Sequence, residues 1–467
     1  MSNYAAVRDN IIKRPSRGDS LYQRIIVVSA YGGITDFLLE HKKSGKPGVY
    51  ALFADGLNDD SWRDLLCSLK AELFSINKSL FGSESLRKKA DIFIATRVDD
   101  AERCLSDLQS LCQHGHFALE SHLSEVREML ASVGEAHSAW NMTELLKLDG
   151  VNACYVDLTG WKSANQTSLD QRIETAFKEI KLSKQLPIVT GYAHSDTGVM
   201  SNFDRGYSEM IFSRIAVLTQ AKEAVIHKEF HLSSADPRLV GEDKAVPIGR
   251  TNYDVADQLA SLGMEAIHPK AAKGLRHNNI PLRVKNTFEP GHPGTLISSD
   301  YLSDQPCVEI IAGRKGIYAL ELFDQDMTGS VDEYDREILA FIRRFKAHVV
   351  SKDINANTVT HYLYTNLKTI KRIRSALQGR YSDAEINQTK VAVVSAIGSN
   401  MHVPGILAKA VTALADSNIS VLAVHQSMRQ VDMQFVINED DYDLAVQSLH
   451  RCLVEVHDHG RAISFAT

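Results

Sequence analysis

The sequence predicts an α/β fold followed by two smaller α+β domains, and three observations support this prediction. Short apolar runs alternate with amphipathic helical patterns up to residue 299, which is typical of a mostly parallel sheet between helices. The order strand, helix, strand, strand, helix then occurs twice, which indicates a tandem ferredoxin-like repeat. The chain has 467 residues, 44% of them hydrophobic, enough for about three domains of about 150 residues. We place the domains at 1–299, 306–385 and 386–467.

The first domain reaches its first buried strand at Arg24–Ala30, after a polar segment. Gly32 and Gly33 end that strand. A helical stretch without proline follows from 61 to 148, because apolar residues recur there at helical spacing. Strands are expected again at 152–158, 185–192, 223–227 and 281–286, with helices at 206–220, 252–262 and 270–277. This alternation predicts a three-layer αβα domain.

The two smaller domains follow a boundary near residues 299–306. The first repeat has strand patterns at 307–313, 315–323, 347–353 and 358–365 and a helical pattern at 333–345. The second has strand patterns at 389–398, 419–427 and 431–438 and helical patterns at 404–416 and 440–453. The prediction of a repeat depends on this order of strands and helices, because the two segments have little residue-level similarity to each other.

Composition excludes several classes of protein. The net charge is -6, which disfavours a general nucleic-acid binder. No apolar run reaches the roughly 18 residues of a membrane span, and the first twenty residues lack the apolar core of a signal peptide. The six cysteines are scattered without a C-x-x-C pair, so we expect no zinc site or disulfide framework. We therefore expect a cytoplasmic protein with free thiols.

Common nucleotide-binding signatures are missing from the sequence. There is no G-x-x-x-x-G-K-[ST], and no G-x-G-x-x-G follows a strand. Both a P-loop enzyme and a Rossmann dehydrogenase are therefore disfavoured.

Five stretches place glycine or turn residues after strands, where ligands bind in open α/β sheets. Each taken alone also fits an ordinary turn, helix surface or helix cap. Their order and spacing together are specific, and they are Ser29–Asp36, Gly134-Glu135, Phe203–Glu209, Ser234–Arg238, and Leu262–Pro269 followed by Ile280–Ser298.

These stretches resemble the motifs of aspartate kinases in the amino acid kinase family. VVSAYGGIT matches the family's V-S-A-x-x-G-x-T loop, RGYSE resembles its R-G-G-S-D turn, and A-D-P-R is intact at Ala235–Arg238. The segment Ile280–Ile297 is nearly intact, and the tail resembles the family's two ACT regulatory domains. The segments HKEFHLSSADP and VEIIAGRKG resemble the branch that accompanies ectoine synthesis. The resemblance covers the chain from Arg24 onward and implies a carbamate-kinase-like first domain.

The resemblance implies that ATP phosphorylates the β-carboxylate of L-aspartate, giving 4-phospho-L-aspartate and ADP. Positioning and charge neutralisation would carry this reaction. Ser29, Gly32 and Gly33 would lie near the transferred phosphoryl group, and Glu209 belongs to the same catalytic set. Arg205 and Ser208 would hold the α-carboxylate, Glu135 the α-amine, and Thr35 the substrate. Mg²⁺ would be bound by phosphates and water, with no metal site made by the protein.

On the nucleotide side the resemblance implies six positions, several of which depart from the family pattern. Lys228 and Glu229 stand for the usual Thr-Asp, Ser233 for a Tyr, and Glu265 for a Lys. Asp236 and Arg238 are retained, and Arg238 would contact the ATP phosphates. The ectoine-type branch shares these departures, which favours a variant pocket over an inactive one.

The resemblance also implies a homodimer formed through the ACT domains and an amino-acid effector at Ser399–Ile406. The segment His425-Gln426-Ser427 differs from the Ser-x-Ser-Glu pattern of feedback-inhibited members, so we expect weak or absent inhibition by lysine. Two other functions stay open. One is a catalytically impaired amino-acid-sensing protein that keeps the ACT pair. The other is a kinase for another carboxylate, which the Arg205 and Glu135 pairing disfavours.

The N-terminus departs most from the family, which opens with a strand ending in K-x-G-G-T-S. No such motif occurs in residues 1–467, and Tyr4–Ile12 resembles the helix that follows it. The motif's lysine would neutralise the phosphoryl group during transfer. Either Met1 is an internal methionine of a longer reading frame, or the chain is a pseudokinase. We favour the first explanation, because the other substrate residues are retained.

We therefore expect a protein that starts at Met1 to be weak or inactive, and an upstream extension that restores the motif to make it active. An aspartyl-hydroxamate assay on both proteins measures this difference. Equal and robust activity of the shorter protein would refute the role assigned to the lysine. In the genomic DNA upstream, an in-frame codon run for the motif supports the enzyme, and a stop codon supports the sensor.

Overall fold

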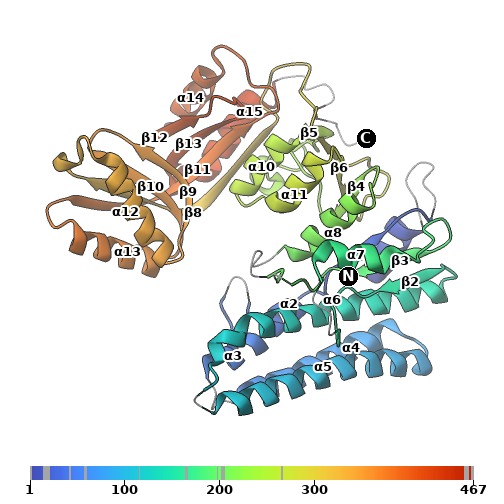
Figure 1. Ribbon diagram of the computed structural model, residues 1–467. Coiled ribbons are helices and arrows are strands. Elements are labelled where there is room, and N and C mark those ends of the chain that lie inside the picture. The colour runs from blue at the N-terminus through green and yellow to red at the C-terminus, as the bar shows by residue number, and fades with distance from the viewer. Residues whose placement is uncertain are drawn as a thin grey trace. The chain divides into compact units, whose positions relative to one another are not determined.

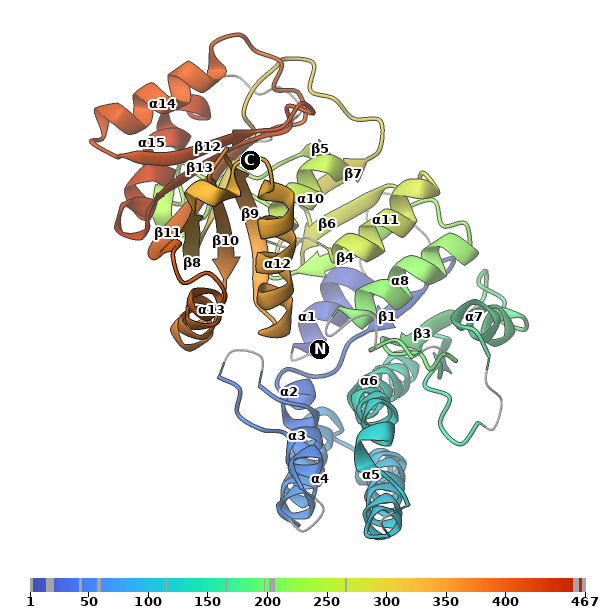
Figure 2. The same ribbon diagram turned by 60° about the vertical axis from the view of Figure 1, so that its left-hand side comes forward.

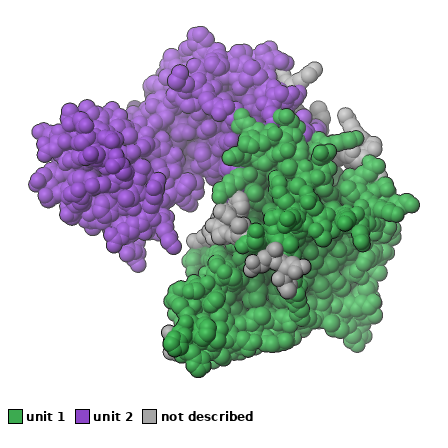
Figure 3. Space-filling view, in the orientation of Figure 1, with its two compact units in different colours: residues 1–224, 270–280, 287–291 green, residues 225–269, 281–286, 292–467 purple. Residues whose placement is uncertain are grey.

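The computed structural model describes residues 3–13, 21–41, 44–56, 60–114, 116–163, 167–196, 198–200, 206–264, 267–456 and 462–463. The chain divides into two compact units (Figure 3). Unit 1 comprises Met1–Ala224, Lys270–Ile280 and Thr287–Gly291. Unit 2 comprises Val225–Pro269, Pro281–Asn286 and His292–Thr467.

Unit 1 contains a parallel sheet with helices on both faces. Its strands are β1 (Ile26–Val28), β2 (Ala153–Val156) and β3 (Leu186–Thr190), in the order β1-β3-β2. Ile188 packs on one face with α6 (Leu123–Leu148). Its neighbour Val189 packs on the other face with α7 (Leu169–Phe177) and α8 (Tyr207–Leu218). Every residue of β3 is buried, and its sequence is apolar from Leu186 to Val189 rather than alternating.

The predicted helical stretch forms a bundle around α6. It includes α4 (Ser61–Leu80) and α5 (Glu84–Cys112), which run alongside each other in Figure 1 and pack against α6 and the shorter α2 (Ile34–Leu38) and α3 (Val49–Asp55). Trp62 of α4 is fully buried in this cluster. At the start of the chain, α1 (Tyr4–Ala6) continues into a π-helical segment, Val7–Ile12, where the sequence predicts a helix. The remaining helix of unit 1, α11, begins at Pro269 and ends at His277.

Unit 2 begins with a small mixed sheet. Its order is β4-β6-β7-β5, with β4 at Ala224–Lys228, β5 at Arg250–Asn252, β6 at Leu282–Asn286 and β7 at Thr295–Ser298. β6 and β7 are antiparallel, because the turn residues of the Pro290–Gly294 segment reverse the chain between them. β5 runs parallel to β7 and leads into α10 (Tyr253–Ser261).

The two predicted repeats form one antiparallel sheet of six strands, in the order β12-β13-β11-β8-β10-β9 (Figure 2). The first repeat comprises β8 (Ile310–Phe323), α12 (Val331–Arg344), β9 (His348–Ile354), β10 (Thr358–Tyr364) and α13 (Leu367–Arg380). The second comprises β11 (Glu385–Ile397), α14 (Ile406–Asp416), β12 (Val421–Gln426), β13 (Asp432–Asn438) and α15 (Tyr442–Leu453). The repeats therefore pair edge to edge within one chain, along β8 and β11.

The central strand β8 differs from its predicted form. The sequence predicts two strands separated near Gly313–Gly316, whereas the structure has one strand of 14 residues. The pairing of β11 with β8 shifts register between Val391 and Val393, which lie opposite Ile317 and Arg314 of β8. Leu320 and Leu322 at one end of β8 pack in the core of the first repeat.

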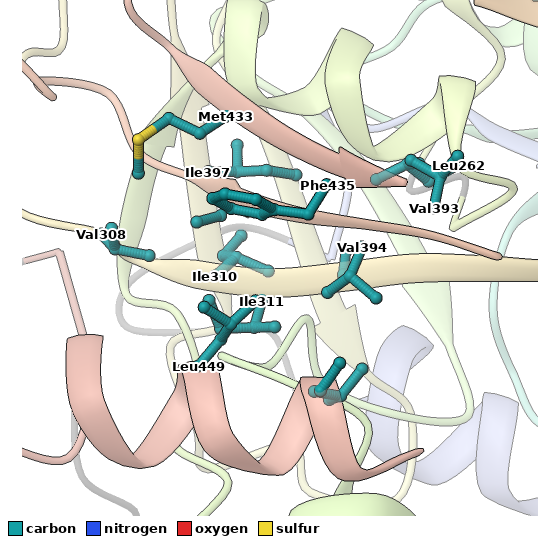
Figure 4. Packing of buried hydrophobic residues seen from close by; sticks show 14 of the residues in the cluster. Leu262, Val308, Ile310, Ile311, Val393, Val394, Ile397, Met433, Phe435 and Leu449 are labelled. Atoms are coloured by element: carbon teal, nitrogen blue, oxygen red, sulfur yellow. The ribbon is translucent and has the colours of Figure 1, made fainter. Parts of the chain in front are cut away.

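The other end of β8 belongs to a different core. Ile310 and Ile311 pack there with Val394, Phe435 and Leu449 of the second repeat (Figure 4). The same cluster takes in Leu232, Ile248 and Leu262, which precede the repeats in the chain. Unit 2 therefore has a continuous core that joins its small mixed sheet to the second repeat. The boundaries predicted at residues 299–306 and 385 stay predictions.

Candidate active site

The loop after β1 is shaped by two glycines. Gly33 has a φ of +83° and precedes α2, a conformation that an L side chain rarely adopts. The Tyr31 carbonyl accepts a hydrogen bond from the Ile34 amide at 3.1 Å, which closes the turn. Ser29, Gly32 and Gly33 are exposed, and Thr35 is half-buried in the first turn of α2. The loop thus presents a hydroxyl and side-chain-free backbone at the carboxyl end of a parallel strand.

Helix α6 lies directly against this loop. A Cβ atom at Gly134 would lie 2.8 Å from the Ala30 Cβ, so only glycine allows the approach. One turn further on, the Ser138 hydroxyl donates to the Ser29 carbonyl at 2.8 Å. The Gly-Glu pair identified in the sequence therefore has a structural reason for its glycine.

Glu135 is a buried carboxylate, and only one of its two oxygens has a hydrogen-bond partner among the described residues. Its side chain is 2% exposed, and its Oε1 accepts a hydrogen bond from the Tyr207 hydroxyl at 2.9 Å. Its Oε2 has no hydrogen-bond partner among the described residues. Burial raises the pKa of Glu135 to about 7, and the hydrogen bond from Tyr207 opposes that rise. A buried acceptor left unpaired is costly, and a cationic amine would satisfy it.

The start of α8 closes the same region. Gly206, with a φ of +91°, is the N-cap of α8, followed by the buried Tyr207 and the half-buried Ser208 and Glu209. Arg205 lies outside the described residues. Within unit 1 the structure thus gathers Ser29, Gly32, Gly33, Thr35, Glu135, Ser208 and Glu209 on the β1 loop, α6 and the first turn of α8.

Gly191, at the end of β3, is a residue of this region that the sequence analysis did not identify. A Cβ atom there would lie 2.6 Å from the Val28 carbonyl oxygen and 2.8 Å from the Ser208 Oγ. Gly191 therefore keeps β3 and the start of α8 close together. Its signal was present in the sequence, since a glycine directly follows the buried strand IVT.

The predicted nucleotide-side residues lie in unit 2, on β4 and the segment that follows it. Lys228 ends β4, and Glu229 is exposed beside it. Ser233 forms an isolated antiparallel bridge with Pro247, which holds the segment in place. Glu265 lies outside the described residues.

Asp236 and Arg238 form a compact turn at the start of α9 (Pro237–Val240). The Asp236 Oδ1 accepts a hydrogen bond from the Arg238 amide at 3.0 Å, and its Oδ2 lies 2.7 Å from the Arg238 Nη2. The Arg238 guanidinium holds the pKa of Asp236 below its usual range. The Arg238 side chain is 89% exposed, and its Nε and Nη2 both donate to the Asp236 carboxylate.

In the described residues, no three or more His, Cys, Asp or Glu side chains form a group that could hold a metal ion. Nor does any helix in the described ranges have the length and apolar character to cross a membrane.

Comparison with known proteins identifies two families in the chain. The model of the amino acid kinase family matches residues 4–286, and an ACT domain model matches residues 394–453. A protein of Stutzerimonas stutzeri named aspartate kinase Ask_Ect is 53% identical over 466 residues, covering 100% of this chain and 98% of that protein. Aspartokinase 1 of Arabidopsis thaliana is 24% identical over 76% of this chain and 65% of its own length.

Solved structures share the fold at lower identity. Escherichia coli aspartokinase III with lysine and aspartate has a TM-score of 0.71 and 20% identity, covering 97% of this chain and 96% of that one. The same enzyme with aspartate and ADP has a TM-score of 0.68 and 19% identity, with 96% of each chain covered.

The buried Glu135 predicts a pH dependence of stability. Its pKa is 4.5 in the unfolded chain and about 7 in the folded protein. Between pH 4.5 and 7 the folded protein therefore keeps a proton on Glu135 that the unfolded chain has released. The free energy of unfolding should therefore fall as the pH rises from about 4.5 to 7, by up to about 3 kcal/mol from this group. Glu135→Gln should remove this contribution in denaturant titrations across that range.

The control is Glu125→Gln, which removes an exposed carboxylate from the same helix. If Glu135→Gln and the unchanged protein lose stability equally between pH 4.5 and 7, the raised pKa of Glu135 is wrong.

Proposed function

We infer the activity from one premise: this chain belongs to the amino acid kinase family, in which it is an aspartate kinase of the ectoine type. Its reaction is ATP-dependent phosphorylation of the β-carboxylate of L-aspartate, giving 4-phospho-L-aspartate and ADP. Identity of 53% along the whole chain supports this activity. The assignment of individual residues to the reaction is our proposal.

The observation that carries the aspartate site is the Oε2 of Glu135, which has no hydrogen-bond partner among the residues that the structure describes. We assign to it the α-amine of aspartate, because a buried carboxylate with one free oxygen gains most from a cationic donor. Ser208, together with Arg205, would hold the α-carboxylate. Thr35 would orient the substrate, and Ser29 with the amides of Gly32 and Gly33 would face the phosphoryl group.

The protonation state of Glu135 also affects the binding of aspartate. Because its pKa is raised to about 7, half of the free protein carries a neutral Glu135 near that pH. Only the ionised carboxylate pairs with the aspartate amine, so binding of aspartate and release of this proton are coupled.

On the nucleotide side we assign Arg238 to the ATP phosphates, with Asp236 holding it in the turn. Lys228, Glu229, Ser233 and Glu265 would complete a variant nucleotide pocket. Asp236 orients the exposed guanidinium by accepting from its Nε and Nη2, so a phosphate would bind the remaining N–H groups of Arg238. Mg²⁺ would enter with ATP, coordinated by phosphate oxygens and water.

The ACT region supports a regulatory proposal. The loop before α14 lines a pocket of about 360 Å³ with Met401, His402, Val403, Pro404 and Gly405, and Gln426 and Gln430 face it from β12 and the segment after it. We propose an amino-acid effector for this pocket. A pure sensing protein without catalysis is the second candidate, favoured by the same pocket.

We also propose that the protein is a homodimer. The pairing of β8 with β11 uses one edge of each repeat within the chain and leaves β12 and β9 as the outer strands. Leu422 and Val424 lie on one face of β12 and are 50% and 41% exposed, so a second copy that covers this face would bury apolar surface.

The aspartate site is tested by Glu135→Gln, which keeps the shape of the side chain and removes its charge. The KM for aspartate should rise about a hundredfold, because one partner of a buried ion pair is lost. The KM for ATP should stay within about twofold of its original value. The aspartyl-hydroxamate assay measures both constants, on the form of the protein that is active.

Glu125→Gln serves again as the control and should leave both constants unchanged. An unaltered aspartate KM in Glu135→Gln would remove Glu135 from the site. If neither the protein that starts at Met1 nor the protein with the upstream extension phosphorylates aspartate, the sensing function replaces the kinase.

The effector proposal predicts weak or absent inhibition by lysine. The imidazole of His425 on β12 lies 3.3 Å from the Asp353 carboxylate, where feedback-inhibited members have a different pattern. Initial rates with millimolar lysine should stay close to the rate without it. Full inhibition under these conditions would contradict the prediction.

A further inference from the structure

The turn before Arg238 is hydrogen-bonded to the last helix of the second repeat. Ser234 has no exposed surface, and its Oγ lies 2.9 Å from the Nε2 of His450 on α15. The Ser234 carbonyl accepts a second bond, at 2.7 Å, from the amide of Ile311 in β8. Figure 4 shows Leu449, the neighbour of His450, packed beside Ile311. A residue two positions before Asp236 is therefore held by two elements of the ACT region.

The Ser234 Oγ and both ring nitrogens of His450 have hydrogen-bond partners. The Val246 amide donates to the Ser234 Oγ at 3.0 Å, and the Nδ1 of His450 lies 3.1 Å from the Glu455 Oε1. Burial lowers the pKa of His450, so its ring is neutral near pH 7. A neutral ring donates through one nitrogen only. With Nδ1–H donating to Glu455, Nε2 accepts from the Ser234 hydroxyl, and His450 fixes the direction of that hydroxyl.

The order Ser234, His450, Glu455 resembles a nucleophilic triad, but its surroundings exclude that chemistry. Ser234 and His450 both have 0% relative exposure, and the Val246 amide already occupies the serine oxygen. A nucleophile needs open space where a substrate carbonyl can approach. The arrangement therefore orients the backbone of the turn and does not react.

A second contact ties α15 to the same segment. The Gln447 side chain donates to the Leu239 carbonyl at 2.8 Å, at the end of α9. Gln447 and His450 lie three residues apart and therefore on one face of α15. The turn and α9 are thus attached to one face of this helix, on both sides of Arg238.

We propose that His450 is a positioning residue for the ATP site: it holds Ser234, and through the short turn Asp236 and Arg238, in the place that the phosphates require. This rests on the proposed assignment of Arg238 to ATP. It adds that a helix of the second ACT repeat sets the affinity for nucleotide, while the affinity for aspartate is set in unit 1.

The test uses His450→Leu, which removes both ring nitrogens, and His450→Gln, whose amide can reach the position of Nε2. The Kd for ATP from calorimetry and the KM for ATP should both rise about tenfold in His450→Leu, as for one lost buried hydrogen bond. His450→Gln should recover most of this loss. The KM for aspartate should stay within about twofold in both variants.

Ser448→Ala is the matched control. Ser448 is a buried polar residue of the same helix, but its hydroxyl bonds Ser417 at 2.7 Å, in the contact with α14. It should leave the Kd for ATP unchanged. If Ser448→Ala weakens ATP binding as much as His450→Leu does, general loosening of α15 explains the effect and the inference is wrong.

A double-mutant cycle tests whether His450 acts through Ser234. Ser234→Ala and His450→Leu together should weaken ATP binding no more than the stronger single variant. Fully additive losses would overturn the inference, as would an unchanged ATP affinity in His450→Leu. Normal ATP binding by the protein with the upstream extension, without phosphorylation of aspartate, would overturn the proposed kinase function and leave the role of His450 standing. Absence of ATP binding would overturn both.

Discussion

The close approach of α6 to the loop after β1 is the constraint on which the proposed aspartate site depends. A single missing side chain, at Gly134, allows the helix to lie against Ala30. The next residue, Glu135, is thereby buried directly beneath a loop that exposes its own backbone. Further along α6, Asn141 donates to the Tyr31 hydroxyl at 3.2 Å, and the His137 ring packs edge-on against the Tyr31 ring. Helix α6 therefore contacts three successive residues of the loop, Ser29, Ala30 and Tyr31.

Two buried carboxylates, one in each unit, differ in how fully they are hydrogen-bonded. In unit 1, Glu135 has one oxygen that no described residue satisfies, and an unsatisfied buried acceptor is costly. In unit 2, Glu309 is equally inaccessible, yet its carboxylate accepts hydrogen bonds from the Ser399 amide at 3.0 Å and the Thr251 hydroxyl at 3.3 Å. A buried carboxylate with an unsatisfied oxygen is typical of a ligand-binding site. A buried carboxylate whose oxygens both accept hydrogen bonds is typical of a structural contact. The bond between Ser234 and His450 is of the second kind.

Local patterns in the sequence were sufficient for much of this architecture. The apolar run at β3, the helical stretch at 61–148 and the order of the two repeats all follow from periodicity, which is a property of neighbouring residues. Motif resemblance identified Glu135 and Arg238, but it could not reveal that Glu135 has an unpaired oxygen, because this depends on residues up to 72 positions away. Gly191 was missed because its reason is a close contact with Ser208. The interruption expected near Gly313–Gly316 was wrong, since pairing with β11 on one side keeps β8 continuous.

The contacts of the nucleotide-side turn have a consequence for how the protein is made. Ser234 and His450 are 216 residues apart, and the Gly249 amide donates to the Ala462 carbonyl at 3.0 Å. Domains generally fold as units while synthesis proceeds from the N-terminus. The parallel sheet of unit 1 has all its strands once residue 190 has emerged from the ribosome, whereas the turn must wait for the last helix. The strands that carry the proposed aspartate residues can therefore pair well before the turn that carries Arg238 gains its contact with α15.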